Sequence, residues 1–192
     1  IRRPPRSTQG VSSAASDVYK RQKLRDLINE SIQSEDLYAK VLVDKDSPYL
    51  KSIILNKGSK DNVKIGMAIV DNSYLVGKVI EVNYTNSRAL LLSDLNSKIP
   101  VLLEPLDVHA VASGTGKNYG VIEYTKDDYD QIIKDKEIIV YTSGYGGLFK
   151  PGLPVGKIIY DNTINDNIIN FFSDFRQLDY VKIVSYDIGS GN

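Results

Sequence analysis

Short runs of β-branched and aromatic residues, separated by turn-forming residues, make up most of the chain after residue 36. Within the runs, apolar residues either alternate with polar ones or form brief continuous stretches, which is typical of strands buried on one or both faces. The predicted strands are 39–43, 51–55, 67–70, 75–82, 88–93, 99–103, 109–113, 120–124, 138–142 and 155–160, with one or two more between residues 171 and 185. This pattern predicts a mainly β fold of the barrel or sandwich type.

The densest cluster of glycine and proline lies between residues 142 and 157, where it joins two of the predicted strands. Its composition is incompatible with a helix and predicts a rigid loop. The strand after it begins Val-Gly-Lys-Ile-Ile at 155–159, and an almost identical Val-Gly-Lys-Val-Ile occurs at 76–80, about eighty positions earlier. A unit this small cannot bury its apolar face alone, so the repeat indicates two similar β-modules.

The sequence therefore predicts two small β-barrels, the first at 37–98 and the second at 99–188. An alternative arrangement inserts the second barrel into the first, so that the C-terminal strands complete the first barrel. Residues 23–36 precede the barrels and carry apolar side chains on one helical face, at Leu24, Leu27, Ile28 and Ile32. This amphipathic helix is too short to be stable alone and is expected to be the end of a coiled coil.

Residues 1–22 are basic, poor in large apolar side chains and without periodicity. Such a segment cannot offset the entropy cost of ordering and is expected to be disordered. It also resembles translated sequencing adapters, so we expect a non-native leader and exclude it from functional reasoning.

Charge and cysteine content narrow the range of functions. Lys plus Arg and Asp plus Glu both number 24, so the formal net charge is zero and no long-range field favours nucleic acid. Cysteine is absent, which excludes disulfides and thiolate chemistry. No apolar run reaches the length of a membrane-spanning helix.

Candidate catalytic groups are few. His109 is the only histidine, and without a second one nearby it predicts no metal site. A serine hydrolase on a double barrel would combine Ser143, His109 and an aspartate, but the sequence around Ser143 matches neither common nucleophile motif. The glycines at 144–147 precede a proline-rich loop and a strand, so they do not form a phosphate-binding loop. We predict no catalytic, cofactor-binding or metal-binding residue, with the hydrolase as the alternative.

The aromatic and aliphatic residues around the 142–157 loop are the candidate contact surface. Exposed aromatics on a rigid loop suit partner binding. The predicted partner or self-association surface consists of Tyr141, Tyr145, Leu148, Phe149 and Leu153. The same aromatics could instead fill a barrel end. Residues assigned to loop geometry are Gly144, Gly152, Pro154 and Gly156.

Several motifs, taken in order, resemble the MreC family of rod shape-determining proteins over residues 37–185. They are Ile-Ile-Leu-Asn-Lys-Gly-Ser at 53–59 with Asp-Asn-Val at 61–63, Gly-Met-Ala-Ile-Val at 66–70 with Leu-Val-Gly-Lys-Val at 75–79, Ser-Arg-Ala-Leu-Leu-Leu-Ser-Asp at 87–94 with Ile-Pro-Val at 99–101, Thr-Ser-Gly at 142–144 and Pro-Gly-Leu-Pro-Val-Gly-Lys at 151–157. The chain has Asn62 where the family usually has Gly, and asparagine tolerates the same positive φ.

The resemblance implies a non-enzymatic scaffold of the bacterial cell-elongation machinery, which maintains rod shape by activating peptidoglycan-synthesising enzymes. It implies a protein anchored in the inner membrane, with most of its chain in the periplasm and its anchor missing from this sequence. The implied partners are a second copy in a dimer or filament, MreD, an elongation-specific penicillin-binding transpeptidase and, indirectly, MreB. Exposed strand edges would also permit β-augmentation into filaments.

Overall fold

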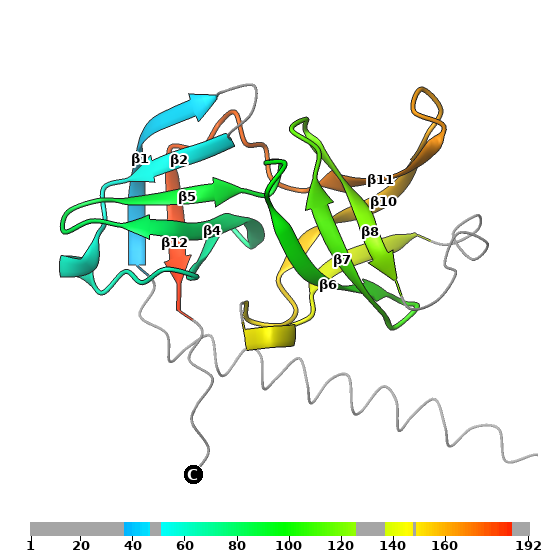
Figure 1. Ribbon diagram of the computed structural model, residues 1–192, viewed down its shortest axis with the longest axis horizontal. Helices are drawn as coiled ribbons and strands as arrows, with labels where there is room; N and C mark the ends of the chain where they lie inside the picture. Colours follow the sequence, from blue (N-terminus) through cyan, green and yellow to red (C-terminus); the bar gives the residue numbers. More distant parts are fainter. Residues whose placement is uncertain (1–36, 47–50, 126–136, 148, 186–192) are drawn as a thin grey trace, which may run out of the picture. The chain divides into compact units, whose positions relative to one another are not determined.

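The computed structural model describes residues 37–46, 51–125, 137–147 and 149–185 of the chain (Figure 1). The chain divides into a unit of residues 1–35 and a unit of residues 36–192, and the described residues all belong to the second. The predicted leader, the predicted helix at 23–36 and Leu148 lie outside the described residues. Among the described residues, none forms a helix with the length and apolarity needed to cross a bilayer.

The first barrel is a closed antiparallel sheet in the strand order β1-β12-β3-β4-β5-β2. Its strands are β1 (Leu37–Asp46), β2 (Lys51–Leu55), β3 (Ala68–Asp71), β4 (Tyr74–Val82), β5 (Ser87–Leu91) and β12 (Tyr180–Val184). A 3-10 turn, η1 (Ser59–Asp61), follows β2, and Asn62 ends it with φ of 64°. Asparagine at 62 thus adopts the positive φ expected from the sequence.

The second barrel is also closed, in the order β10-β11-β8-β7-β6-β9. Its strands are β6 (Lys98–Glu104), β7 (Val108–Gly114), β8 (Tyr119–Thr125), β9 (Ile138–Thr142), β10 (Pro154–Asp161) and β11 (Asp166–Phe171), with η3 (Tyr145–Gly147) in the loop after β9. Figure 1 shows the β10–β11 hairpin in orange at the end of this barrel.

The second barrel is inserted into the first. β12 pairs with β1, at Leu37 opposite Ile183, and with β3, at Ile69 opposite Ile183. The side chains of Val181 and Ile183 are buried in the core of the first barrel. The sequential division into 37–98 and 99–188 therefore needs correction, because the last strand completes the first barrel rather than the second.

Alternating side chains along each strand separate the core from the outer surface. In β6, for example, Ile99, Val101 and Leu103 are buried, whereas Pro100 and Leu102 face outward and are half-buried. This period of two is the direct consequence of strand geometry. The strands thus give each barrel an aliphatic core and leave a second set of side chains for the outer surface.

The repeated Val-Gly-Lys motif lies in β4 and β10, and these two strands contact each other. Next to this contact, Ser173 Oγ donates to the Leu75 carbonyl at 3.4 Å. The rings of Tyr74 and Phe172 lie 5.1 Å apart between centroids. The repeat in the sequence therefore marks corresponding strands at the junction between the barrels.

Asp94 lies in the turn that leads from β5 into β6, and it is completely buried. Its carboxylate accepts hydrogen bonds from the Lys51 N–H and from the Asn96 N–H, both at 2.7 Å. A buried carboxylate is stable only with such donors. Asp94 thereby ties the start of β2 to the connection between the barrels.

Candidate functional site

The loop between β9 and β10 is held by Thr142. The Thr142 hydroxyl donates to the Lys150 carbonyl at 2.5 Å and accepts from the Leu153 N–H at 2.9 Å. The Thr142 carbonyl accepts from the Gly152 N–H at 2.8 Å. Because one residue satisfies three distant backbone groups, the loop has a fixed path.

Glycines shape this path at two bends. Gly144 has φ of 71° and Gly152 has φ of 84°, a region that side-chain-bearing residues rarely adopt. Gly156 is different: a Cβ there would lie 2.4 Å from the Asn170 carbonyl oxygen of the neighbouring strand β11. Pro154 begins β10 and pairs with Tyr141.

The predicted contact residues of the loop have different environments. Tyr145 is 77% exposed, on η3. Phe149 is 1% exposed and belongs to the hydrophobic core, so its assignment to a contact surface is corrected. Tyr141 and Leu153 are half-buried, and Leu153 packs against the core. The aromatic side chains of this loop thus divide between a core residue and a surface residue.

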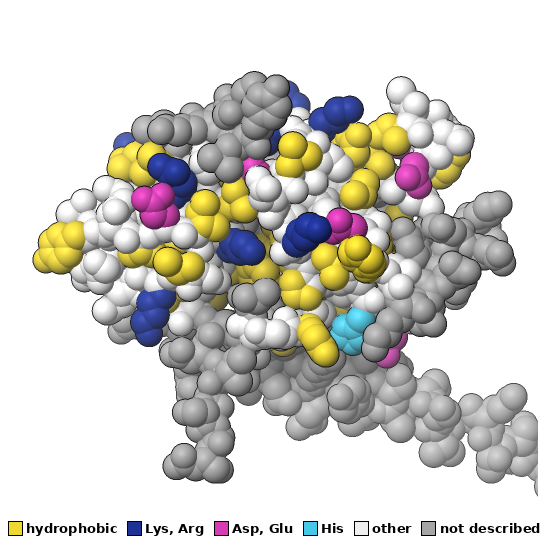
Figure 2. Space-filling view, in the orientation of Figure 1, with side chains coloured by type: hydrophobic (Ala, Val, Ile, Leu, Met, Phe, Trp, Pro, Cys, Tyr) yellow, Lys and Arg dark blue, Asp and Glu magenta, His cyan; other side chains and the backbone are white. Residues whose placement is uncertain are grey.

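Tyr145 lies at a groove on the outer face of the second barrel, with a volume of about 310 Å³. Pro100 of β6, Val111 of β7 and Tyr124 of β8 line it in one cross-strand row, since Val111 is opposite both Pro100 and Tyr124. The Ser143 N–H donates to the Pro100 carbonyl at 3.1 Å, which attaches the loop to this row. In Figure 2, where histidine is cyan, hydrophobic side chains adjoin it on this face.

Sequence reasoning did not select Pro100, Val111 or Tyr124 as site residues. Each occupies an outward-facing position of its strand yet carries an apolar or aromatic side chain, with Tyr124 68% exposed. Apolar residues at outward positions of consecutive strands were the available signal. Only the strand register shows that they form one row.

No Asp, Glu, Lys or Arg is among the described residues that line the groove. Outside the lining, Lys98 Nζ lies 2.8 Å from a Glu123 carboxylate oxygen. Ser113 Oγ donates to the same carboxylate at 2.8 Å. The hydrogen bond from Lys98 is the main cause that lowers the pKa of Glu123, and the hydrogen bond from Ser113 is the second. Lys98 and Glu123 thus neutralise each other, and the described part of the groove lining carries no carboxylate, ammonium or guanidinium group.

The groove also contains the candidate hydrolase residues His109 and Ser143. The Ser143 hydroxyl oxygen accepts a hydrogen bond from the Tyr145 N–H at 3.2 Å. Within the described ranges, no hydrogen bond joins His109 to Ser143, and no three metal-ligating side chains cluster. The arrangement orders the loop and gives the serine hydrolase alternative no support.

Comparison with known proteins matches this fold to one family. The family model described as "Rod shape-determining protein MreC, barrel core" matches residues 41–185. The chain belongs to the MreC family. Its relatives include the cell shape-determining protein MreC of Haemophilus influenzae, 32% identical over 155 residues, which are 79% of this chain and 42% of that protein. The chain thus spans less than half the length of this MreC relative.

Solved MreC structures share the double-barrel fold. The crystal structure of MreC from Pseudomonas aeruginosa is 28% identical, with a TM-score of 0.66, and the match covers 79% of this chain and 99% of that one. MreC in a complex with a penicillin-binding protein (PBP2) from Helicobacter pylori is 14% identical, with a TM-score of 0.53, and the match covers 79% and 99% of the two chains. At that identity, the second likeness concerns the fold alone.

Proposed function

We propose that this protein is a non-enzymatic scaffold of the cell-elongation machinery, which self-associates and binds and activates an elongation-specific penicillin-binding transpeptidase. Membership of the MreC family supports the role in cell shape. The Helicobacter pylori MreC that forms a complex with PBP2 has the same fold, which supports a transpeptidase as the partner. MreD and, indirectly, MreB are the further proposed partners. The proposed location of this protein is the inner membrane, with most of its chain in the periplasm.

The observation that carries the proposal is the groove on the second barrel, whose described lining is apolar and aromatic with a few neutral polar side chains. Its exposed Tyr124 and Tyr145 are the kind of side chain that dominates binding energy at protein interfaces. The Thr142 hydrogen bonds hold the loop that presents Tyr145. A preordered surface of this kind loses little conformational entropy when a partner binds.

Activation follows from differential binding and requires no chemistry of the scaffold itself. If the groove binds the active conformation of the transpeptidase more tightly than the inactive one, binding shifts the enzyme's population toward activity. A tenfold difference in affinity between the two conformations corresponds to about 1.4 kcal/mol. The groove needs only a rigid shape to produce this effect.

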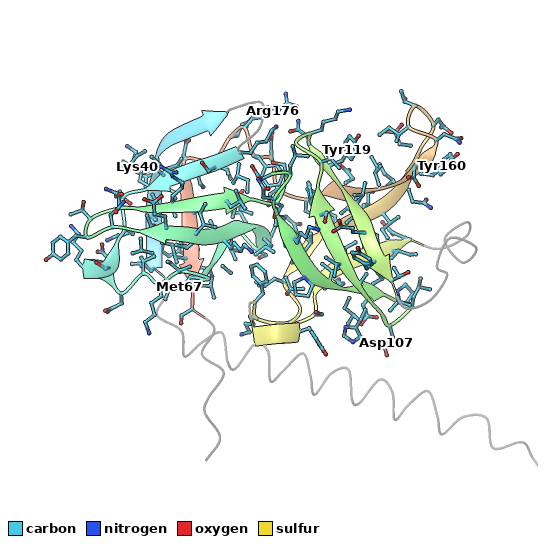
Figure 3. All side chains as sticks on the ribbon, in the orientation of Figure 1. Lys40, Met67, Asp107, Tyr119, Tyr160 and Arg176 are labelled. Atoms are coloured by element: carbon cyan, nitrogen blue, oxygen red, sulfur yellow. The ribbon has the colours of Figure 1, made fainter. Side chains whose placement is uncertain are left out.

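Sedimentation equilibrium of the chain, with and without a purified periplasmic transpeptidase domain, tests the proposal. We expect a defined complex that Tyr124→Ser and Tyr145→Ser each weaken by about tenfold or more, as expected for interface hot spots. Tyr160→Ser is the matched control, because Tyr160 is exposed on β10 and does not line the groove (Figure 3). Absence of a complex, or a complex indifferent to both groove substitutions, would contradict the proposal.

A further inference from the structure

We infer that one end of the first barrel binds the surface of an anionic lipid bilayer. The binding surface is a rim that consists of residues 57–67 and the β4–β5 turn at 83–86, and both parts lie within the continuously described residues 51–125. Ile65 and Tyr84 enter the headgroup region, and lysines of the rim bind lipid phosphates. This inference rests on the proposed location of the protein at the inner membrane.

The two parts of the rim form one rigid unit because backbone hydrogen bonds join them. The Ser59 N–H donates to the Asn83 carbonyl at 2.9 Å, and the next N–H, that of Lys60, donates to the Tyr84 carbonyl at 3.1 Å. A Cβ at Gly58 would lie 2.4 Å from the Asn83 carbonyl oxygen, so this close approach requires glycine. Figure 1 shows η1 beside the β4–β5 turn, at the left of the first barrel. Lys60 and Tyr84 therefore have fixed backbone positions next to each other.

Ile65 lies in the rim between two residues that hold the segment to the barrel. Val63 is buried in the core, and Met67 packs against the core (Figure 3). Between them, Gly66 has φ of 92°, and its N–H donates to the Val79 carbonyl at 2.8 Å. Ile65 itself is 69% exposed. The segment is thus ordered, and it presents one large aliphatic side chain to the solvent.

The rim is positively charged although the chain as a whole is neutral. Residues 57–67 contain three lysines and one aspartate, so their net charge is three minus one, or +2. Lys57 Nζ lies 3.0 Å from a carboxylate oxygen of Asp61, which accounts for the single negative charge. Lys60 and Lys64, both exposed, supply the excess positive charge. Charge complementarity therefore favours an anionic occupant.

Exposed apolar side chains accompany this charge. Tyr84 is 73% exposed beside Lys60, and Ile65 directly follows Lys64. At a membrane surface, tyrosine rings lie at the level of the headgroups and aliphatic side chains enter the boundary of the acyl chains. Lysine can bury its stem against apolar groups while its ammonium group stays at the lipid phosphates. An anionic bilayer matches both the apolar and the charged side chains of the rim.

The place of the rim in the fold agrees with this occupant. Leu37, the first residue of β1, is opposite Ile183, and Ile183 is opposite Ile69 of β3. β3 begins at Ala68, directly after the rim. The chain that precedes the first barrel thus joins it at the end that carries the rim. A membrane anchor before Leu37 would hold this end toward the bilayer.

Fluorescence of a single tryptophan tests the insertion, because the chain has no tryptophan of its own. The emission of Ile65→Trp should shift to shorter wavelength with vesicles of equal parts phosphatidylethanolamine and phosphatidylglycerol, and should stay unchanged with vesicles of phosphatidylcholine alone. Tyr160→Trp, at an exposed position of β10 in the second barrel, is the matched control and should shift with neither. No shift at position 65 would overturn the inference.

Co-sedimentation of the chain with the same anionic vesicles measures the contribution of each side chain. Lys60→Ala, Lys64→Ala and Tyr84→Ser should each weaken vesicle binding about fivefold. Lys117→Ala and Tyr160→Ser, at exposed positions of the second barrel, are the matched controls and should leave it unchanged. Vesicle binding through the basic residues 1–22 would be insensitive to all of these substitutions, and that result would overturn the inference. Thermal unfolding of each variant checks that the fold is intact.

Two comparisons separate the bilayer from a protein partner and from the proposed function. If poly-glutamate, a soluble acidic polypeptide, shifts the emission of Ile65→Trp and vesicles do not, the rim binds a protein and the inference is wrong. A complex with the transpeptidase domain without vesicle binding would overturn the inference and leave the proposed function standing. Vesicle binding through the rim without that complex would overturn the proposed partner alone.

Discussion

Thr142 and Leu153, at opposite ends of the β9–β10 loop, are joined by two hydrogen bonds. The Thr142 N–H donates to the Leu153 carbonyl at 2.9 Å, and the Leu153 N–H donates to Thr142 Oγ1, also at 2.9 Å. The pair closes the loop at its base. The exposed tyrosine in the loop therefore has a fixed support, which makes Thr142 a structural residue of the proposed binding surface.

Thr142→Val tests this support. Valine keeps the shape of threonine but leaves the Leu153 N–H and the Lys150 carbonyl without their side-chain partner. We expect a loss of about 1–3 kcal/mol in the free energy of unfolding, measured by urea denaturation, because unsatisfied buried polar groups are costly. Ser143→Ala is the control, because Ser143 is half-buried and its hydroxyl accepts only a local hydrogen bond, from the Tyr145 N–H, while its backbone bond to Pro100 is kept in the variant. Equal stability of Thr142→Val and Ser143→Ala would contradict the assignment of Thr142 as the structural support of the loop.

Phe149 and Tyr145 should respond in opposite ways to truncation. Phe149→Ala removes a fully buried ring and should cost about 3–5 kcal/mol in unfolding free energy. Tyr145→Ala removes an exposed ring and should change stability by no more than about 0.5 kcal/mol. Chemical denaturation measures both. Phe149→Leu, which restores much of the lost volume, should recover part of the stability, and failure to do so would argue against a packing role.

The glycines of the repeated motif should be intolerant of a methyl group. A Cβ at Gly77 would lie 2.1 Å from the Leu90 carbonyl oxygen, and one at Gly156 would lie 2.4 Å from that of Asn170. Both obstacles are backbone, so Gly77→Ala and Gly156→Ala should each destabilise the protein by about 1–3 kcal/mol through overpacking. Thermal unfolding is the measurement. Lys78→Ala, the next position in β4, is the control, and equal melting temperatures for Gly77→Ala and Lys78→Ala would refute the steric argument.

Acid should weaken the Lys98–Glu123 ion pair, which links β6 to β8. Hydrogen bonding to Lys98 lowers the pKa of Glu123 from its ordinary 4.5, so the carboxylate stabilises the fold above that pH. This contribution is lost as the pH falls through the lowered pKa. Melting temperatures measured from neutral pH to about pH 2 should fall less steeply in Glu123→Gln than in the unmodified protein. Glu104→Gln, on β6, is the control, and identical pH profiles for all three proteins would contradict the prediction.

The stability contributed by the Lys98–Glu123 ion pair also depends on pH at the alkaline end, where it decreases as the pH rises. Hydrogen bonding to Glu123 raises the pKa of Lys98 above 10.5. Its contribution is therefore complete below pH 10.5 and is lost as the pH rises through the raised value. Both groups are at the surface, so added salt should reduce the two effects together.

Strand positions were largely predictable because β-branched residues and turn-forming residues alternate along the chain. β11 (Asp166–Phe171) is an exception, since it begins with polar residues directly after a turn. The pairing of β12 with β1 matches the inserted arrangement that the sequence analysis gave as the alternative, but local patterns could not decide between the two arrangements. Periodicity indicates which face of a strand is buried, but not which distant strand will lie beside it.

The candidate site was predictable only in part. Local sequence treats Tyr145 and Phe149 alike, as aromatic residues of one glycine-rich loop, and only the tertiary structure buries the second. The ends of the groove row, Pro100 and Tyr124, are 24 positions apart in the sequence, and the row depends on the register of β6, β7 and β8. The suggestion of β-augmentation stays a prediction: both sheets close into barrels, but β8 pairs with β11 only at Tyr119 and Gly120 among the described residues.

The insertion of one barrel into the other also sets an order for synthesis on the ribosome. All strands of the second barrel, β6 to β11, leave the ribosome before Tyr180, where the last strand of the first barrel begins. Until that strand appears, the nascent first barrel has an open wall between β1 and β3. A prematurely terminated polypeptide would thus carry one finished module and one with an exposed apolar interior, which makes it a natural substrate for chaperones and proteases.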